Sequence, residues 1–370
     1  MKVALIHYWL VGMRGGEKVL EELCKLYPDA DIFTHVAVPE KLSDTILDHQ
    51  IYETFISKLP GARKHYQKYL PLMPLALESL DLTSYDLVIS SESGPAKGVI
   101  TRPDALHVCY VHSPMRYIWD QYHVYRESSG IVTRILMPII SQKMRVWDAA
   151  SSARVDKYIS NSKFVAQRVE KAWRRASEVI YPPVDVSAFK PEEGIEPEEF
   201  YLYAGELASY KRADIAVQAF RKTGRKLVVV GTGAEREKLM KSAGKNIEFV
   251  GRVSFAELKS YYARCKALVF PGIEDFGIIP LEVMASGRPV VAYNAGGAKE
   301  TVIDGKTGVL FGDPSSDSLN EAIDRLENIY PSLRMHEIVE HAKGFSPEIF
   351  SRRISNFIES ELAERQAVAQ

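Results

Sequence analysis

Residues 270–282 read FPGIEDFGIIPLE, and this stretch joins a strand pattern to a helix pattern through a loop that contains glycines. The apolar run 267–270 in front of it predicts a buried strand. Pro280 suits the first turn of a helix, so we expect a helix to begin near that residue. The unpaired N–H groups and the positive dipole end of such a helix form a site for an anion above the sheet.

Short apolar runs alternate with amphipathic helical stretches along the whole chain, a pattern typical of parallel β-α-β units. In the first half, we expect strands over 3–8, 32–35, 87–90, 108–112 and 157–160, with a helix over 17–26. In the second half, we expect strands over 201–204, 227–230, 247–250, 267–270 and 289–293, and helices over 213–220, 235–242, 255–264 and 281–286.

A stiff, polar connection separates the two halves. Residues 181–185 read YPPVD, and an acidic stretch, PEEGIEPEE, follows over 191–199. Paired prolines favour an extended connection, and the glutamates cannot build a core. We therefore expect a first domain over 1–181, a second over 182–346, and a C-terminal amphipathic helix over 347–370 that crosses back to the first domain. The predicted fold class is α/β, with two Rossmann-like, doubly wound parallel-sheet domains facing each other across a cleft.

Composition excludes several classes of protein. Of 370 residues, 46% are hydrophobic and 26% are charged, which is typical of a soluble globular chain. With 47 basic and 48 acidic residues the net charge is −1, so no overall field attracts nucleic acid, and we expect no nucleic-acid partner. Three widely spaced cysteines, at 24, 109 and 265, predict neither a disulfide framework nor a zinc site. We expect a cytoplasmic protein.

Membrane-related signals are weak. No apolar run reaches the roughly 18 residues that a membrane-spanning helix needs. The apolar N-terminus, 1–10, is interpreted as a first strand rather than a signal peptide. Residues 135–140 read ILMPII between Arg134 and Lys143. Two interpretations of this piece stay open: it rests on a bilayer surface, or it forms a buried or partner-facing helix.

Two carboxylates and two cations flank the predicted anion site. Glu274 lies in the loop and Glu282 lies about one turn into the helix. Ionised carboxylates accept hydrogen bonds, so the pair suits polyol hydroxyls on either side of a phosphate. The alternative is a surface loop residue and a partner for the helix dipole. Lys211 and Arg212 follow another strand, and Lys211 suits a diphosphate, although such a pair also fits a solvated helix start.

Glycines follow two further strands. Gly231 and Gly233 follow the strand over 227–230, but Arg236 stands where a dinucleotide fingerprint needs its third glycine, which disfavours an NAD-dependent oxidoreductase. Residues 15–16, both glycine, follow the first strand and open a helix, which favours another anion site.

His112 stands at a strand end, where it has either a structural or a site role. Residues 29–31 read DAD, like a metal-binding motif of other sugar transferases, but fit a polar connection better.

Together these motifs resemble glycosyltransferase family 4, whose members are retaining, metal-independent enzymes of the two-Rossmann-domain (GT-B) architecture. The main element is the E-x7-E pattern from Glu274 to Glu282, supported by 15–16, 112, 160–162, 181–185, 211 and 231–233. Residues 110–119 and 210–212 look most like bacterial and archaeal mannosyltransferases of surface-polysaccharide assembly.

The resemblance implies roles for individual residues. Glu274 would hold hydroxyls of the donor sugar, Glu282 the ribose, and Lys211 the diphosphate, while His112 would lie beside the transferred sugar. Backbone amides at 16, 278 and 279 would add donors to the diphosphate, and 231–233 with 252 and 253 would flank the base. The implied catalytic residues are His112, Lys211 and Glu274. The implied donor-binding residues are Gly15, Gly16, Glu206, Lys211, Arg212, Gly231, Gly233, Arg252, Val253, Glu274, Phe276, Gly277, Ile278, Ile279 and Glu282.

One departure from the family pattern concerns charge. The family commonly has arginine directly after the glycine at the first strand end of the second domain, where this chain has Glu206. We hypothesise that Arg212 partly replaces that charge, although neighbouring residues on a helix point about 100° apart. Alternatively, diphosphate binding relies on Lys211 and the helix end.

The resemblance implies a metal-independent transfer, with retention, of a hexose from a nucleotide sugar to a saccharide or lipid-linked saccharide. GDP-mannose is favoured by family likeness, and UDP-sugars stay open. We also expect domain closure about 182–183, with possible membrane contact through the N-terminal domain at the inner face of the cell membrane. The rival interpretations are a nucleotide-sugar hydrolase or epimerase and a catalytically silent nucleotide-sugar-binding subunit.

Overall fold

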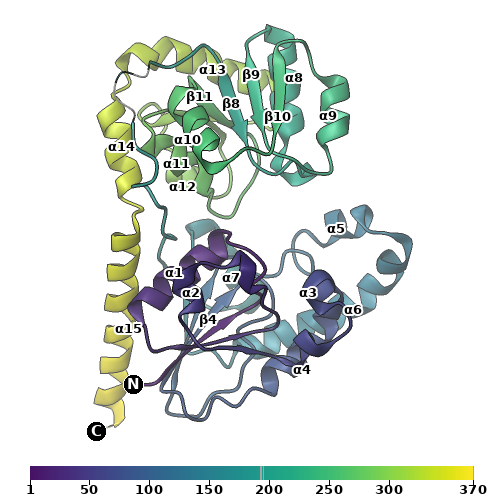
Figure 1. The fold of residues 1–370 in the computed structure, drawn as a ribbon, viewed down its shortest axis with the longest axis vertical. Coiled ribbons are helices and arrows are strands. Elements are labelled where there is room, and N and C mark those ends of the chain that lie inside the picture. The colour runs from purple at the N-terminus through teal and green to yellow at the C-terminus, as the bar shows by residue number, and fades with distance from the viewer. Residues whose placement is uncertain (192–193, 195, 370) are drawn as a thin grey trace. The chain divides into compact units, whose positions relative to one another are not determined.

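The computed structural model describes residues 1–191, 194 and 196–369 (Figure 1). The chain divides into two compact units, which we call unit 1, Met1–Pro183 with Phe350–Gln370, and unit 2, Val184–Ile349. Three residues of the acidic stretch, at 192, 193 and 195, and the last residue of the expected C-terminal helix, at 370, lie outside the described residues.

In the described part of unit 1, seven strands form one parallel sheet in the order β3-β2-β1-β4-β5-β6-β7. The strands are β1 Val3–His7, β2 Asp31–Thr34, β3 Ile51–Glu53, β4 Leu87–Glu92, β5 Leu106–Val111, β6 Lys157–Ser160 and β7 Glu178–Val179. The α-helices are α1 Gly15–Leu26, α2 Asp44–Leu47, α3 Ala62–His65, α4 Met73–Glu78, α5 Tyr122–Ser128, α6 Ile131–Ser152, α7 Lys163–Trp173 and α15 Pro347–Ala369, which begins in unit 2; the 3-10 helices are η1 Pro39–Lys41, η2 Phe55–Lys58 and η3 Tyr66–Leu72.

Unit 2 repeats this plan with a six-stranded parallel sheet, among its described residues, in the order β10-β9-β8-β11-β12-β13. The strands are β8 Tyr201–Ala204, β9 Leu227–Val230, β10 Ile247–Gly251, β11 Ala267–Phe270, β12 Val290–Tyr293 and β13 Gly308–Phe311. The helices are α8 Ala213–Thr223, α9 Arg236–Ser242, α10 Phe255–Arg264, α11 Ile278–Ala285, α12 Ala298–Thr301, α13 Ser316–Ile329, α14 Met335–Lys343, and the 3-10 helices η4 Ser209–Lys211 and η5 Tyr330–Ser332.

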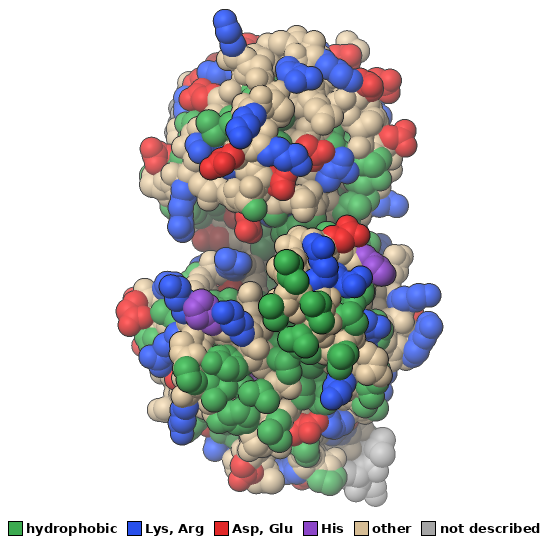
Figure 2. All heavy atoms as spheres, turned by 90° about the vertical axis from the view of Figure 1, so that its right-hand side faces the viewer, with side chains coloured by type: hydrophobic (Ala, Val, Ile, Leu, Met, Phe, Trp, Pro, Cys, Tyr) green, Lys and Arg blue, Asp and Glu red, His purple; other side chains and the backbone are tan. Residues whose placement is uncertain are grey.

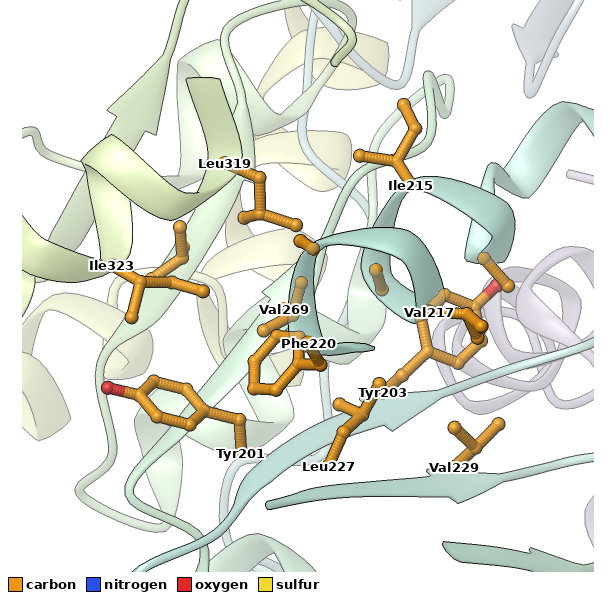
Figure 3. Packing of buried hydrophobic residues seen from close by; sticks show 14 of the residues in the cluster. Tyr201, Tyr203, Ile215, Val217, Phe220, Leu227, Val229, Val269, Leu319 and Ile323 are labelled. Carbon is orange, nitrogen blue, oxygen red and sulfur yellow. The ribbon is translucent and has the colours of Figure 1, made fainter. Parts of the chain in front are cut away.

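The core of unit 2 forms where α8 and α13 pack on the sheet (Figure 3). Phe220 of α8 lies against Tyr201 of β8, and Leu319 and Ile323 of α13 join the same buried cluster. The strands are apolar on nearly every residue because both faces of the sheet are covered, as is usual for parallel sheets. This packing fixes the strand ends from which the site loops extend.

The α/β fold class of two doubly wound parallel sheets is confirmed, and each of the ten expected strands is present. Three strands were not expected: β3, β7 and β13. The first two are edge strands of three and two residues, too short for a periodic pattern. The third, β13, begins with Gly308 directly after the polar residue Thr307. Its few apolar residues therefore resemble the end of a loop.

Helix α15 contributes to the core of unit 1. Its Phe350, Ile354 and Ile358 are buried in the same cluster as Val3 and Leu5 of β1. These three side chains lie on one face of the helix, as its spacing predicts. The end of the chain therefore supplies a helix that packs into the core of unit 1.

The apolar piece 135–140 lies within α6, which continues through Pro138. Ile135 is 67% exposed and Ile139 is 61% exposed. The interpretation as a buried helix is therefore wrong. Among the described residues no helix is both long and apolar enough to cross a membrane. The three cysteines are buried, free thiols.

Candidate functional site

The strand order of unit 2 reverses between β8 and β11, which lie side by side in the sheet. β8 leads on one side to β9, and β11 leads on the other side to β12. In open parallel sheets, the loops that leave the carboxyl ends of such a strand pair separate and bind ligands. The loop after β8 contains Lys211, and the loop after β11 contains Glu274.

The structure brings Lys211 and Glu274 into direct contact. The Lys211 Nζ lies 2.9 Å from the Glu274 Oε1, and the two side chains are 15% and 22% exposed. Burial alone would lower the pKa of Lys211, but the Glu274 carboxylate raises it above its usual value. Lys211 therefore stays charged. Its charge is balanced by the carboxylate of Glu274, which lies in the loop that is expected to hold the donor sugar.

Helix α11 begins at Ile278, with Gly277 as its N-cap at φ 87°. The helix expected to start near Pro280 thus begins two residues before it, with Pro280 in the first turn as expected. Pro280 is the third helical residue, where the missing N–H costs no helical hydrogen bond because the first four N–H groups have no acceptor within the helix. The left-handed conformation at Gly277 is one that other residues rarely adopt. It turns the chain so that the N–H groups at 278 and 279 open the helix.

A pocket of about 250 Å³ lies next to this helix start, entirely within unit 2. It brings together Gly231, Arg252, Val253, Ile279 and Glu282 from the sequence analysis. The remaining lining residues are Ala204, Gly205, Val230, Leu258 and Tyr262. Predicted base-flanking residues and the predicted ribose ligand thus share one pocket.

Close backbone packing shapes the floor of this pocket. A Cβ added at Gly231 would lie 1.9 Å from the carbonyl oxygen of Gly205, so no larger residue fits there. On the opposite wall, α10 begins with a capping box in which Ser254 and Glu257 bond each other's backbone N–H. This start fixes the helix that carries Leu258 and Tyr262 into the lining.

Glu282 receives a hydrogen bond from Tyr262, whose hydroxyl lies 3.1 Å from the carboxylate Oε2. Burial raises the pKa of Glu282 to about 7, partly opposed by this hydrogen bond. Tyr262 was not expected from the sequence, because it lies 20 residues from Glu282 and looks like an ordinary core position of α10.

Arg212 pairs with a neighbouring carboxylate rather than with Glu274, whereas the negative charge of Glu206 helps to raise the pKa of Lys211. The Arg212 guanidinium contacts the Asp214 carboxylate, with Nε to Oδ1 at 3.0 Å and Nη2 to Oδ2 at 3.1 Å. Glu206 is exposed. The charge of Arg212 is therefore balanced by Asp214, as that of Lys211 is by Glu274, so ion pairing alone does not decide which cation binds a diphosphate.

Other predicted residues surround the Glu274 loop. Phe276 is buried, and the Gly297 N–H donates to the Glu274 carbonyl oxygen at 2.9 Å. Gly233 packs so tightly that an added Cβ would lie 2.4 Å from the Leu207 carbonyl oxygen. The loop after β11, which contains Glu274, and the loop after β9, which contains Gly233, are thus both held by backbone contacts.

In unit 1, the structure places Gly16 and His112 around the end of β1. A Cβ at Gly16 would lie 2.3 Å from the Tyr8 hydroxyl and 3.5 Å from the His7 ring, so the start of α1 contacts this strand end directly. The Tyr8 and His112 ring centroids are 6.4 Å apart. Gly15 is the first residue of α1.

His112 is held through a serine that the sequence did not single out. The Ser91 Oγ lies 2.8 Å from the His112 Nε2 and 3.0 Å from the His7 Nδ1. The Asn161 amide donates to the His112 carbonyl oxygen at 3.0 Å. Side chain and backbone of His112 are therefore both fixed.

This contact pattern favours one tautomer of His112. Burial lowers the pKa of both His7 and His112, the latter to about 4, so both rings are neutral near neutral pH. Among the described residues the buried His7 Nε2 has no hydrogen-bond partner. A bare nitrogen is less costly there than an unpaired N–H, so His7 carries its proton on Nδ1 and donates to Ser91. Ser91 then donates to His112 Nε2, which leaves the His112 proton on Nδ1.

Of the DxD-like residues at 29–31, Asp31 makes a structural contact and Asp29 is exposed. Asp31 opens β2, and its carboxylate accepts a hydrogen bond from the Tyr85 hydroxyl at 2.6 Å. In the described part of the chain, no group of three or more His, Cys, Asp or Glu side chains is arranged to hold a metal ion.

Two family models match adjacent parts of the chain. Residues 13–188 match the model of Glycosyltransferase Family 4, and residues 185–345 match the model of Glycosyl transferases group 1. The chain belongs to glycosyltransferase family 4.

Curated relatives of this family 4 chain match parts of it. An uncharacterized glycosyltransferase of Methanocaldococcus jannaschii is 31% identical over 56% of this chain and 59% of the relative. A GDP-mannose-dependent alpha-(1-6)-phosphatidylinositol monomannoside mannosyltransferase of Mycobacterium tuberculosis is 31% identical over 45% of this chain and 51% of the relative. The chain thus matches between half and three-fifths of these relatives' length.

The fold is also that of solved structures. The Anabaena protein HepE in complex with UDP superposes with a TM-score of 0.71 at 18% identity, over 97% of this chain and 100% of HepE. The fold class is therefore GT-B, as the resemblance implied.

The raised pKa of Glu282 predicts a pH-dependent stability in this family 4 chain. The unfolded chain releases the proton near the ordinary pKa of 4.5, whereas the folded protein keeps it until about pH 7. The folded state therefore binds more protons between these values, and its stability falls as pH rises through this window. Glu282→Gln cannot ionise, so we expect its melting temperature to exceed that of the wild type by about 2–4 °C at about pH 8.

At about pH 4 the two melting temperatures should nearly agree, because the wild-type carboxyl is then mostly neutral in the unfolded chain as well as in the folded one. Glu248→Gln, at a side chain that is 56% exposed on β10, is the matched control and should show no such pH-dependent difference. Differential scanning fluorimetry across this range measures the effect. Melting temperatures of the wild type and Glu282→Gln that change in parallel with pH would contradict the prediction.

Proposed function

We propose that this chain is a retaining, metal-independent glycosyltransferase that moves a hexose from a nucleoside diphosphate sugar to a saccharide acceptor. The observation that carries the proposal is the ion pair between Lys211 and Glu274 beside a pocket that contains Glu282. One carboxylate suits the sugar and the other suits the ribose. The start of α11 lies between them in the sequence, and the cation contacts the first of them.

The proposed chemistry needs stabilisation of a leaving diphosphate. The bond from the sugar C1 to the phosphate oxygen breaks, and a bond from the acceptor oxygen to C1 forms on the same face. The acceptor proton passes to the leaving phosphate oxygen. Lys211 and the N–H groups at 278 and 279 would balance the charge that develops on the diphosphate. His112, held by Ser91, would offer its Nδ1–H to a hydroxyl of the transferred sugar.

For the donor we propose GDP-mannose, with a UDP-sugar as the alternative. The Mycobacterium tuberculosis relative is named as GDP-mannose-dependent, which supports the first, and HepE was solved with UDP, which supports the second. Thermal-shift measurements with GDP-, UDP- and ADP-sugars separate these donors, because a ligand that binds the folded state raises the melting temperature by mass action.

For the acceptor we propose a saccharide or a lipid-linked saccharide used in surface polysaccharide or glycoconjugate synthesis. The same relative is named for an acceptor that contains phosphatidylinositol, a membrane lipid. A lipid-linked acceptor would place the enzyme at the inner face of the cell membrane. Closure of the two units about 182–183 would bring His112 to the donor sugar and exclude water.

Product stereochemistry tests this proposal. We expect NMR of the product to show the same anomeric configuration as the donor, because attack and departure share one face of the sugar. Turnover should continue in EDTA, since Lys211 and backbone N–H groups supply the charge stabilisation. Inversion, or loss of activity in EDTA that manganese restores, would contradict the proposal.

Incubation of donor without acceptor separates a hydrolase from the proposed transferase. Rapid release of free sugar would favour a hydrolase, whereas a transferase releases it only slowly. A catalytically silent binding subunit is kept as a second candidate because Glu206 stands where the family commonly has arginine. Tight donor binding with no transfer to any saccharide or lipid-linked acceptor would favour that candidate.

A further inference from the structure

Helix α6 exposes a row of large apolar side chains, which we call the α6 stripe: Ile131, Val132, Ile135, Leu136 and Ile139. Ile131 is 77% exposed and Val132 is 71% exposed. Leu72 of η3 and Leu75 of α4 are exposed as well. Single exposed apolar residues are ordinary, but a contiguous group marks an interaction site.

The α6 stripe does not lie on the face that packs against the protein. The buried residues of α6 are Ser141, Met144, Asp148, Ser151 and Ser152. At about 100° per residue, the centre of the stripe lies roughly 180° around the helix from the centre of this buried set. α6 therefore has an apolar outer face and a partly polar inner face, the reverse of an ordinary surface helix.

α6 and the segment of η3 and α4 form one surface. Leu70 of η3 packs with Ile140 and Met144 of α6. The Trp147 indole donates to the Glu78 carboxylate of α4 at 2.9 Å. On the face of unit 1 that carries α3 to α6, hydrophobic side chains gather beside lysines and arginines (Figure 2).

The charge of this surface differs from that of the whole chain. Residues 62–78 and 122–152 contain seven Lys and Arg and three Asp and Glu, at 78, 127 and 148, of which Asp148 is buried, although the net charge of the chain is −1. The seven are Arg63, Lys64, Lys68, Arg126, Arg134, Lys143 and Arg145. An apolar stripe with a basic rim is the combination that binds the interface of an anionic bilayer.

We propose that unit 1 docks on anionic phospholipid bilayers through the α6 stripe and its basic rim. The stripe enters the boundary between headgroups and acyl chains, and the lysines and arginines contact lipid phosphates. A second copy of this chain is disfavoured as the occupant, because two-fold pairing of this surface brings the same basic rims together. The inference deepens the proposed function, since it places the enzyme where a lipid-linked acceptor lies.

Vesicle flotation with the full chain tests the proposal. We expect binding to vesicles of phosphatidylglycerol and phosphatidylcholine, with much weaker binding to phosphatidylcholine alone and weaker binding at high salt. Ile135→Ser with Ile139→Ser should reduce binding at least tenfold, as should Lys64→Glu with Lys68→Glu. Met240→Ser, at a side chain 45% exposed on α9 of unit 2, is the matched control and should bind as the wild type does.

The outcome is independent of catalysis. Lys211→Ala should float like the wild type, and the stripe variants should keep their melting temperatures because their side chains are solvent-exposed. Transfer to a water-soluble acceptor should be unchanged in the stripe variants, so failure of docking is distinguishable from failure of the proposed function. Lack of binding to anionic vesicles, equal binding by the stripe variants, or self-association that the stripe variants lose would each overturn the proposal.

Discussion

Replacement of Lys211 by alanine is expected to lower the rate constant for transfer by about 10²–10³-fold, the usual effect of removing a preorganised charge or donor from a developing anion. The Lys211 Nζ lies 2.9 Å from the Glu274 carboxylate, which is proposed to hold the donor sugar. The raised pKa of Lys211 keeps the lysine charged. Steady-state kinetics with saturating donor measure the loss.

Lys238→Ala is the matched control, because Lys238 is an 81% exposed lysine of α9. It should retain wild-type turnover. Arg212→Ala decides between the two explanations of diphosphate binding. A loss as large as that of Lys211→Ala would mean that Arg212 leaves Asp214 to bind the donor, whereas a small loss would leave Lys211 as the main cation. Little change in Lys211→Ala would contradict the proposed site.

The second large effect is expected from Glu274→Gln, which should separate catalysis from nucleotide binding. Glutamine keeps an acceptor oxygen but loses the charge that strengthens hydrogen bonds to the donor sugar. We expect kcat/KM to fall about 10²-fold, the low end of the range for loss of one preorganised electrostatic contact.

Affinity for the nucleoside diphosphate without sugar should rise in the same variant, by about fivefold. In the wild type, Lys211 must give up its contact with Glu274 to bind the phosphates, and a partly exposed ion pair is worth about 1 kcal/mol. Isothermal titration with GDP and UDP measures this rise, and Glu340→Gln, at a 64% exposed side chain, is the control. Weaker nucleotide binding by Glu274→Gln would show that the carboxylate does not compete for Lys211.

The sequence predicted the loop and helix that carry Glu274 and Glu282, because both carboxylates lie in one contiguous strand–loop–helix pattern. Contacts between segments that are far apart in the sequence could not be predicted from it. The pairing of Lys211 with Glu274 follows from the adjacency of β8 and β11, which no local pattern determines. The link from Ser91 to His112 likewise depends on the pairing of β4 with β5.

Side-chain exposure was also difficult to predict. Apolar residues at helical spacing usually pack inward, so the piece 135–140 favoured a buried or partner-facing helix. The exposed side chains of Ile135 and Ile139, with Met144 and Asp148 buried on α6, show that the apolar residues point outward. The raised pKa of Glu282 depends on burial, which its place in the first turns of α11 does not reveal.

The C-terminal helix imposes an order on biosynthesis. Unit 2 is continuous over Val184–Ile349, whereas unit 1 needs Phe350 and Ile354 to close its core. During translation the second unit is therefore complete on the ribosome before the first, which reverses the usual N-terminal-first sequence of domain folding. Until α15 emerges, the nascent first unit exposes the apolar patch that this helix later covers, and this is the interval in which a chaperone would be most useful.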